Sequence, residues 1–202
     1  MDPEVGNLWS ADLLIEGSSI VAGAPALDAT DCEVIDATGA IVAPGLIDTH
    51  RHVWQSILRF VAPDWSHADY FHAIRGRFGA RFGADEMYVA NLLGAIEALD
   101  SGITTMLAWC HNINSPDAAD AAVHGLRESG QRAVFAYGNS NDEWAPLPNE
   151  KPLSADARRV RTEHFSSDDG LVTMAVCLRG PQFSSVEATI SDFALARDLA
   201  VP

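Results

Sequence analysis

Two histidines separated by one residue, His50 and His52, are the side chains in this sequence best suited to chemistry. They follow a short apolar run with the composition of a buried strand. Successive strand side chains point to opposite faces, so both imidazoles would share one face and Arg51 would point to the other. Imidazole nitrogen binds zinc and iron, and a hydrolytic metal site needs about three protein ligands. The pair predicts part of a metal site; the alternative is two strand-end histidines bonded to backbone.

Three more polar residues lie where they could join such a site. By its i, i+2, i+4 spacing, Asp48 is expected on the same face as the histidines, where it could orient a ligand imidazole; solvation or a turn cap is the alternative. His111 and Arg179 lie near the ends of two later predicted strands. His111 could contact substrate, act as a substitute ligand, or be a satisfied strand-end histidine. The forked donors of Arg179 suit a planar anion or carbonyl, and an ion pair is the competing explanation.

The first 43 residues have a different pattern from the rest of the chain. Short segments that alternate apolar and polar residues follow one another with no helix between them, at Asp12 to Glu16, Ile20 to Ala22, Glu33 to Ala37 and Ile41 to Ala43. This order predicts a small antiparallel sheet over residues 1–43.

After Pro44-Gly45, predicted strands alternate with predicted helices, which indicates an α/β fold with a parallel sheet over residues 44–202. The strands are expected at Leu46 to Thr49, Thr104 to Trp109, Ala133 to Tyr137 and Leu171 to Leu178. The helices are expected at Glu86 to Asp100, Pro116 to Ser129, Ala155 to Phe165 and Val186 to Leu199, with Ser115 and Ser154 as caps. These make about four β/α units, half of a (β/α)8 barrel.

The segment from Arg59 to Gly83 is long and rich in aromatic residues. Loops that follow barrel strands build the active-site face, so the segment could wall a substrate pocket. Equally, it could pack on the outside of the barrel or on a second subunit.

The acidic composition of the chain argues against some classes of binding partner. The net charge is −15 with 13 Lys plus Arg, so the chain has few cations to neutralise phosphates, and we expect neither nucleic acid nor membrane as a partner. We see no basic leader before an apolar run, and three widely spaced cysteines indicate reduced thiols. A cytoplasmic protein is expected.

The run Pro44-Gly-Leu-Ile-Asp-Thr-His-Arg-His52 resembles the first-strand signature of the amidohydrolase superfamily. The resemblance implies a distorted TIM barrel preceded by a small sheet, with His50 and His52 as metal ligands. The continuation to Val53-Trp54-Gln55 resembles the branch of chlorohydrolases and of guanine and 8-oxoguanine deaminases. There the resemblance implies that Gln55, and less specifically Trp54, touch a heterocyclic substrate.

The resemblance implies a hydrolase of carbon–nitrogen bonds other than peptide bonds. It would deaminate or hydrolyse a purine, pyrimidine or triazine-like compound with water activated by one divalent metal ion, zinc or alternatively iron. The family's histidines on strands 5 and 6 and its aspartate on strand 8 have no counterpart in the chain, so no catalytic base is encoded. A homo-oligomer or a second chain would have to supply the other half barrel. The alternative is a non-catalytic remnant or oligomerising interaction protein.

Overall fold

The computed structural model describes residues 6–139, 153, 155–179 and 183–202. The chain divides into two compact units, Met1–Ala43 and Pro44–Pro202. In the first unit, β1 (Asp12–Glu16) and β2 (Ser19–Ala24) form an antiparallel hairpin. Gly17 in the connecting turn has a φ of 60°, a backbone conformation that glycine adopts without steric cost.

The expected strands at Glu33 to Ala37 and Ile41 to Ala43 are not strands. Both segments lie in irregular backbone, and their apolar side chains are exposed, Ile35 by 85% and Ile41 by 94%. Alternating residues make a strand only when a neighbouring edge accepts their hydrogen bonds. Within the described residues, neither segment pairs with an edge of the hairpin, so the expected sheet is reduced to the hairpin.

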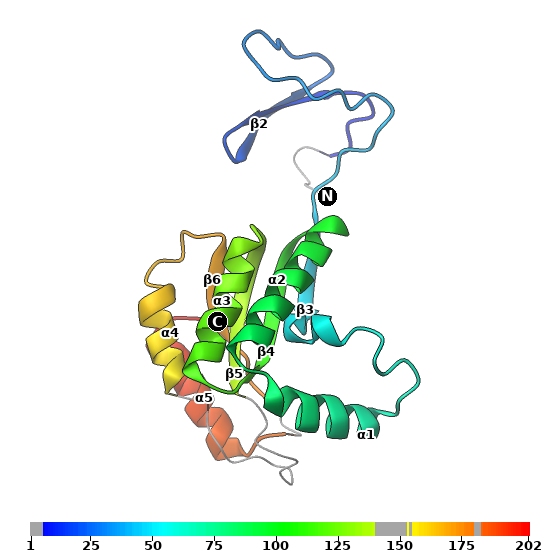
Figure 1. Cartoon of the computed structure of the whole chain (residues 1–202). Coiled ribbons are helices and arrows are strands. Elements are labelled where there is room, and N and C mark those ends of the chain that lie inside the picture. The colour runs from blue at the N-terminus through cyan, green and yellow to red at the C-terminus, as the bar shows by residue number, and fades with distance from the viewer. Residues whose placement is uncertain (1–5, 140–152, 154, 180–182) are drawn as a thin grey trace. The chain divides into compact units, whose positions relative to one another are not determined.

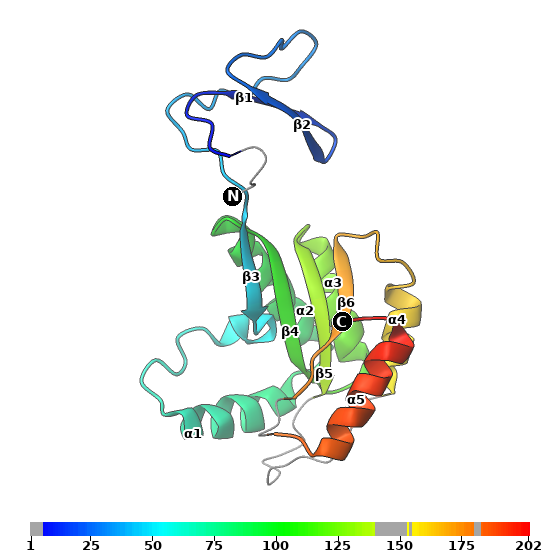
Figure 2. The ribbon, with the colours of Figure 1, turned by 180° about the vertical axis from the view of Figure 1, so that it is seen from behind.

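The second unit is a four-stranded parallel sheet in the order β3-β4-β5-β6, which is also the order of the strands along the chain. The strands are β3 (Leu46–Arg51), β4 (Ile103–Ile113), β5 (Arg132–Asn139) and β6 (Val172–Val176). The helices that connect and follow them are α2 (Ala84–Asp100), α3 (Pro116–Glu128), α4 (Asp156–His164) and α5 (Val186–Leu199). Figures 1 and 2 show α2 and α3 on the same face of the sheet. This is the expected α/β fold, a partial TIM barrel of four β/α units.

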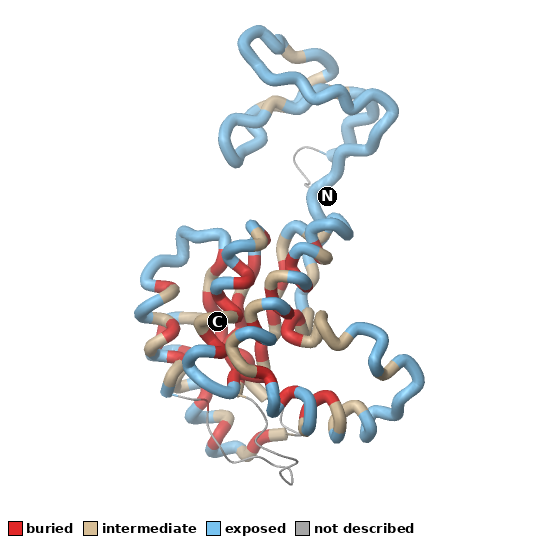
Figure 3. The backbone as a smooth tube through the Cα atoms, in the orientation of Figure 1, coloured by how far each residue is buried: buried red, intermediate tan, exposed pale blue. Residues whose placement is uncertain are grey.

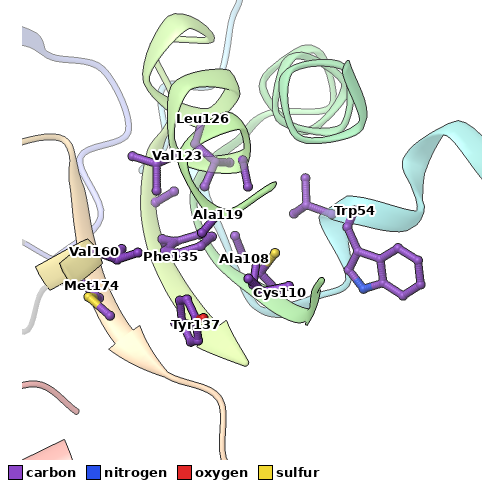
Figure 4. Close-up of a cluster of buried hydrophobic side chains, with 14 of the residues drawn as sticks. Trp54, Ala108, Cys110, Ala119, Val123, Leu126, Phe135, Tyr137, Val160 and Met174 are labelled. Atoms are coloured by element: carbon purple, nitrogen blue, oxygen red, sulfur yellow. The ribbon is translucent and has the colours of Figure 1, made fainter. Parts of the chain in front are cut away.

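The main core lies between the sheet and these helices. Large side chains with almost no exposed surface fill it, among them Phe135, Tyr137, Met174 and Leu126 (Figure 4). In Figure 3 the buried residues concentrate in the sheet and the helix surfaces against it. Ser115 caps α3 as expected, its hydroxyl accepting the Ala118 N–H, while Ser154 lies outside the described residues. No helix in the described part of the chain has the length and apolarity to cross a bilayer.

The aromatic-rich segment after β3 is mostly helical. The 3-10 turn η1 (Val53–Leu58) leads into it from β3. The segment itself contains the short helix α1 (His67–Tyr70), the π-helix η2 (Phe71–Phe78) and the 3-10 turn η3 (Gly79–Arg81). Asn112 and Asn114, at the carboxyl end of β4, both donate to the carbonyl of Gly79. The end of the segment is therefore tied to the edge of the sheet where β3 and β4 finish.

Candidate metal-binding site

The two faces of β3 are set by its pairing with β4. The register shifts between Asp48 and Arg51, which pair with Met106 and Ala108, so β3 carries one extra residue in this interval. Arg51 points toward α2, where its guanidinium lies 3.0 Å from Glu97 Oε2. The extra residue interrupts the alternation, and Asp48 lies with Arg51 instead of with the histidines. Its carboxylate accepts the His50 backbone N–H and lies 3.6 Å from Arg51 Nη1.

His50 and His52 do share a face, and they aim the same nitrogen at each other. The distance between their Nε2 atoms is 3.3 Å, and the rings are perpendicular with centroids 4.8 Å apart. Two nitrogen ligands of a tetrahedral zinc ion, each about 2.0–2.1 Å from it, stand about 3.3–3.4 Å apart. The pair therefore fits two adjacent ligand positions of such an ion. In the metal-free chain, the same separation permits an N–H···N bond between the two rings.

Burial keeps the His52 imidazole neutral. The pKa of His52 is lowered from 6.5 to about 4, chiefly because burial disfavours the charged ring and further because His50 and Arg75 are close. A histidine must be neutral to bind a metal through nitrogen. His52 meets that condition at physiological pH.

His111 is brought into contact with His52 from the neighbouring strand. Its Nδ1 lies 3.1 Å from His52 Nδ1, 3.4 Å from Trp54 Nε1 and 3.3 Å from the Trp109 carbonyl oxygen. Because His111 faces Nδ1 of His52 while His50 faces Nε2, it does not converge on the point shared by His50 and His52. Among the described residues, no group of three or more His, Cys, Asp or Glu side chains could hold a metal ion. Within those residues, His50, His52 and His111 therefore do not form a metal site by themselves.

The other predicted substrate contacts differ in their surroundings. Gln55 is half-buried and donates to the hydroxyl of Tyr70 at 2.7 Å. Trp54 is fully buried against Phe82. Arg179 has an ion-pair partner, Asp192, at 3.8 Å, which is the alternative that the sequence left open. Burial raises the pKa of Asp192, and Arg179 opposes that rise.

Sequence reasoning missed Arg75, a buried arginine on η2. Its Nη1 donates to the His111 carbonyl at 2.8 Å, and its guanidinium lies over the Trp54 ring at 5.7 Å. Burial lowers its pKa to about 10. A charged residue inside the aromatic run Phe71-His-Ala-Ile-Arg-Gly-Arg-Phe78 was the available signal. Its contacts link the aromatic segment to the histidines.

The cysteines near the site are not nucleophiles. Cys110 and Cys177 are buried free thiols, and Cys32 is exposed. Burial raises the pKa of Cys110 to about 12 and that of Cys177 well above its usual value. Both thiols therefore stay protonated and serve as packing residues.

Known proteins are similar to this chain in sequence and in fold. No family model matches the chain. The 5'-deoxyadenosine deaminase of Methanosarcina acetivorans is 28% identical over 174 residues, which is 86% of this chain and 39% of the deaminase. The chain superimposes with a TM-score of 0.70 on a crystal structure of a mutant atrazine chlorohydrolase from Arthrobacter aurescens TC1 complexed with zinc and atraton. The identity is 22%, and the match covers 93% of this chain and 46% of the chlorohydrolase. Guanine deaminase from C. acetobutylicum, with bound guanine, gives 0.69 at 16% identity, covering 91% and 44%.

These similar proteins support a relationship of the chain to the amidohydrolase superfamily. The sequence resemblance carried by Pro44 to His52 is thereby confirmed, and the match corresponds to the N-terminal portion of these amidohydrolases. The chain spans less than half the length of the relatives it matches.

Proposed function

We propose that this chain supplies His50 and His52 as first-strand ligands of a metal-dependent amidohydrolase located in the cytoplasm. The single observation that carries the proposal is the 3.3 Å separation of their Nε2 atoms at the carboxyl end of β3. Zinc is the proposed metal and iron the alternative. The zinc in the superimposed chlorohydrolase and in a similar adenosine deaminase from Xanthomonas campestris supports this choice.

The proposed reaction is hydrolysis of a carbon–nitrogen bond in a heterocycle, with deamination of a purine favoured. Support comes from similar proteins, which are named as deaminases of 5'-deoxyadenosine and guanine. Pyrimidine and triazine substrates are the alternatives, the latter supported by the chlorohydrolase with atraton.

A bound divalent ion would polarise the substrate carbon and activate water for attack. This chain's own residues would hold that ion with neutral imidazoles and position the heterocycle. Gln55, held by Tyr70, and Arg179, paired with Asp192, are our candidates for substrate contact. Trp54 and His111 were expected to touch substrate as well, but Trp54 is fully buried and His111 contacts His52.

Two ligands fall short of the three that a hydrolytic site needs, so the proposed site takes its other ligands from residues beyond those that the structure describes here. Open sheet edges and exposed apolar surface support this. Within the described residues, β3 and β6 each pair with one strand only. On α2, Val89, Leu93 and Ile96 are each 48% exposed at helical spacing, which leaves an apolar stripe without a cover.

Metal content tests the ligand pair. The purified chain should carry zinc or take it up in a dialysis experiment measured by elemental analysis. His50→Ala and His52→Ala should each abolish uptake, whereas His124→Ala, which removes an exposed histidine on α3, should leave it unchanged. Equal metal content in the wild type and the three variants would contradict the proposal.

The rival function is a non-catalytic remnant or an oligomerising interaction protein. The incomplete ligand set and the exposed stripe on α2 favour it. A remnant should form oligomers that hold no stoichiometric metal. Sedimentation combined with metal analysis, and turnover assays with aminopurines, aminopyrimidines and triazines on each oligomer, distinguish the two functions.

A further inference from the structure

The side chains of Gln55 and Tyr70 meet close to the proposed metal ligands. Gln55 lies on η1, where its backbone N–H donates to the His52 carbonyl at 3.0 Å, so it stands one turn beyond a proposed ligand. Its Nε2 donates to the hydroxyl of Tyr70 at 2.7 Å, across 15 positions of the chain. Both residues are half-buried, so a ligand can reach their polar ends where little bulk water competes.

This hydrogen bond assigns roles to the polar atoms that remain. It uses one N–H of the Gln55 amide and one lone pair of the Tyr70 oxygen. The Oε1 of Gln55 is left as an acceptor, and the hydroxyl proton of Tyr70 is left as a donor. Neither has a further hydrogen-bond partner among the residues that the structure describes. The two residues therefore offer a donor and an acceptor side by side.

The position of Tyr70 is fixed by the short helix α1. The Ser66 hydroxyl accepts the Asp69 N–H at 3.2 Å, and the Asp69 carboxylate accepts the Ser66 N–H at 3.1 Å, which caps the start of this helix. The Tyr70 ring packs edge-on against Phe71, with centroids 5.4 Å apart, and Phe71 stacks on Phe183, which follows β6. Because its backbone and its ring are both held, the Tyr70 hydroxyl can keep the Gln55 amide in one orientation.

A donor beside an acceptor matches a particular edge of a heterocycle. An amidine edge carries an amino N–H beside a ring nitrogen, and a lactam edge carries a ring N–H beside a carbonyl oxygen. Either edge can donate to Gln55 Oε1 and accept from the Tyr70 hydroxyl. A heterocycle without an N–H would leave Oε1 unpaired, and a shielded acceptor without a donor weakens binding.

We propose that Tyr70 is a positioning residue that orients the Gln55 amide, and that the pair selects heterocycles with an N–H donor beside an acceptor. The inference rests on the proposed function for the presence of a heterocycle in the site. The hydrogen bond between the two side chains can be tested without any ligand. Tyr70→Phe is the decisive variant, because it keeps the packed ring and removes only the hydroxyl.

Side-chain amide NMR of the metal-free chain tests the bond, with the Gln55 signal assigned by its loss in Gln55→Met. One Nε2 proton of Gln55 should exchange slowly with solvent in the wild type, and both should exchange fast in Tyr70→Phe. Tyr88→Phe is the matched control, since it removes a hydroxyl that donates to Glu128 at 2.7 Å and should leave Gln55 unchanged. Equally fast exchange in the wild type and in Tyr70→Phe would overturn the proposal.

Binding of two probes to the zinc-treated chain, measured by equilibrium dialysis, tests the selectivity. The first probe is 9-methyladenine, whose only N–H groups are on its amino group, and the second is its analogue with a dimethylated amino group. The wild type and Tyr88→Phe should bind the first about tenfold more tightly, the usual effect of a hydrogen bond. Tyr70→Phe should lose most of this preference. Gln55→Met should lose it as well, and it replaces Tyr70→Phe if that variant fails to fold.

Zinc uptake separates this inference from the proposed function. No hydrogen bond or ring contact joins Tyr70 to His50 or His52 within the described chain, so Tyr70→Phe should take up as much zinc as the wild type. If the wild type takes up no zinc, the proposed function fails, while the exchange of the Gln55 amide still decides the bond. A wild type that takes up zinc but binds neither probe, binds both equally, or keeps its preference in Tyr70→Phe would overturn this inference and leave the proposed metal ligands standing.

Discussion

The two faces of the parallel sheet differ in how completely this chain covers them. On the face toward α2 and α3, Ala108, Phe135 and Met174 belong to one large buried cluster. On the opposite face, the buried cluster consists of Ala136, Ala175 and Cys177, with half-buried Leu107, Trp109 and Val134 around it. The face toward α2 and α3 is covered by a continuous buried core. The face that carries His50 and His52 has little packed against it in the described chain. The buried core that stabilises the sheet and the proposed metal ligands therefore lie on opposite faces of the same strands.

Phe135 and Val134 are neighbours on β5 that point to opposite faces, and they test this difference most strongly. Phe135→Ala should lower the free energy of unfolding by about 3–5 kcal/mol, because it leaves a cavity in the closed core. Val134→Ala should cost about 1 kcal/mol or less, because its side chain is already half-exposed. Urea titration measures both changes. Similar losses of unfolding free energy in the two variants would contradict the difference in packing between the two faces of the sheet.

Gly94 on α2 connects the helix face to the site. A Cβ there would lie 2.1 Å from Ser56 Oγ and 2.9 Å from Val53 Cγ1, both on η1, which follows His52. Gly94→Ala should therefore cost about 1–3 kcal/mol of unfolding free energy by overpacking, and should weaken zinc uptake by displacing η1. Gly76→Ala is the matched control, since its Cβ would meet only the Phe71 carbonyl at 3.5 Å and should leave zinc uptake unchanged.

Arg51 lies between the two histidines but belongs to the helix face. Arg51→Met should remove the ion pair with Glu97 and cost about 1 kcal/mol of unfolding free energy, because both side chains are partly exposed. Zinc affinity, measured by chelator competition, should stay within error of wild type. A large loss of affinity would show that the two faces of β3 are not independent.

The smallest stability effect is expected on the apolar stripe of α2. Leu93→Gln should change the free energy of unfolding by no more than about 0.5 kcal/mol, because the side chain is half-exposed in the single chain. If a second copy or second chain covers the stripe, the variant should dissociate in sedimentation experiments. An unchanged oligomer would exclude this stripe as the contact.

Local patterns predicted most of the second unit. All four parallel strands and the helices α2 to α5 lie within a few residues of their expected positions, because periodicity and caps such as Ser115 act over one or two turns. β4 is longer than expected and reaches Ile113, which puts His111 inside a strand. The π-helix η2 has no comparable local signal. Glu33 to Ala37 shows the opposite error, because the residues alternate but the segment pairs with no strand among the described residues.

By itself, the sequence determined that two histidines share a strand face and that this strand belongs to an α/β sheet. Only the tertiary structure decided which atoms of those histidines meet which partners. The register shift that moves Asp48 away from the histidines depends on pairing with β4. The contact between His52 and His111 joins residues 59 positions apart, and the Trp54 contact joins residues 57 apart. Such contacts form only when packing brings distant segments together, so no local spacing encodes them.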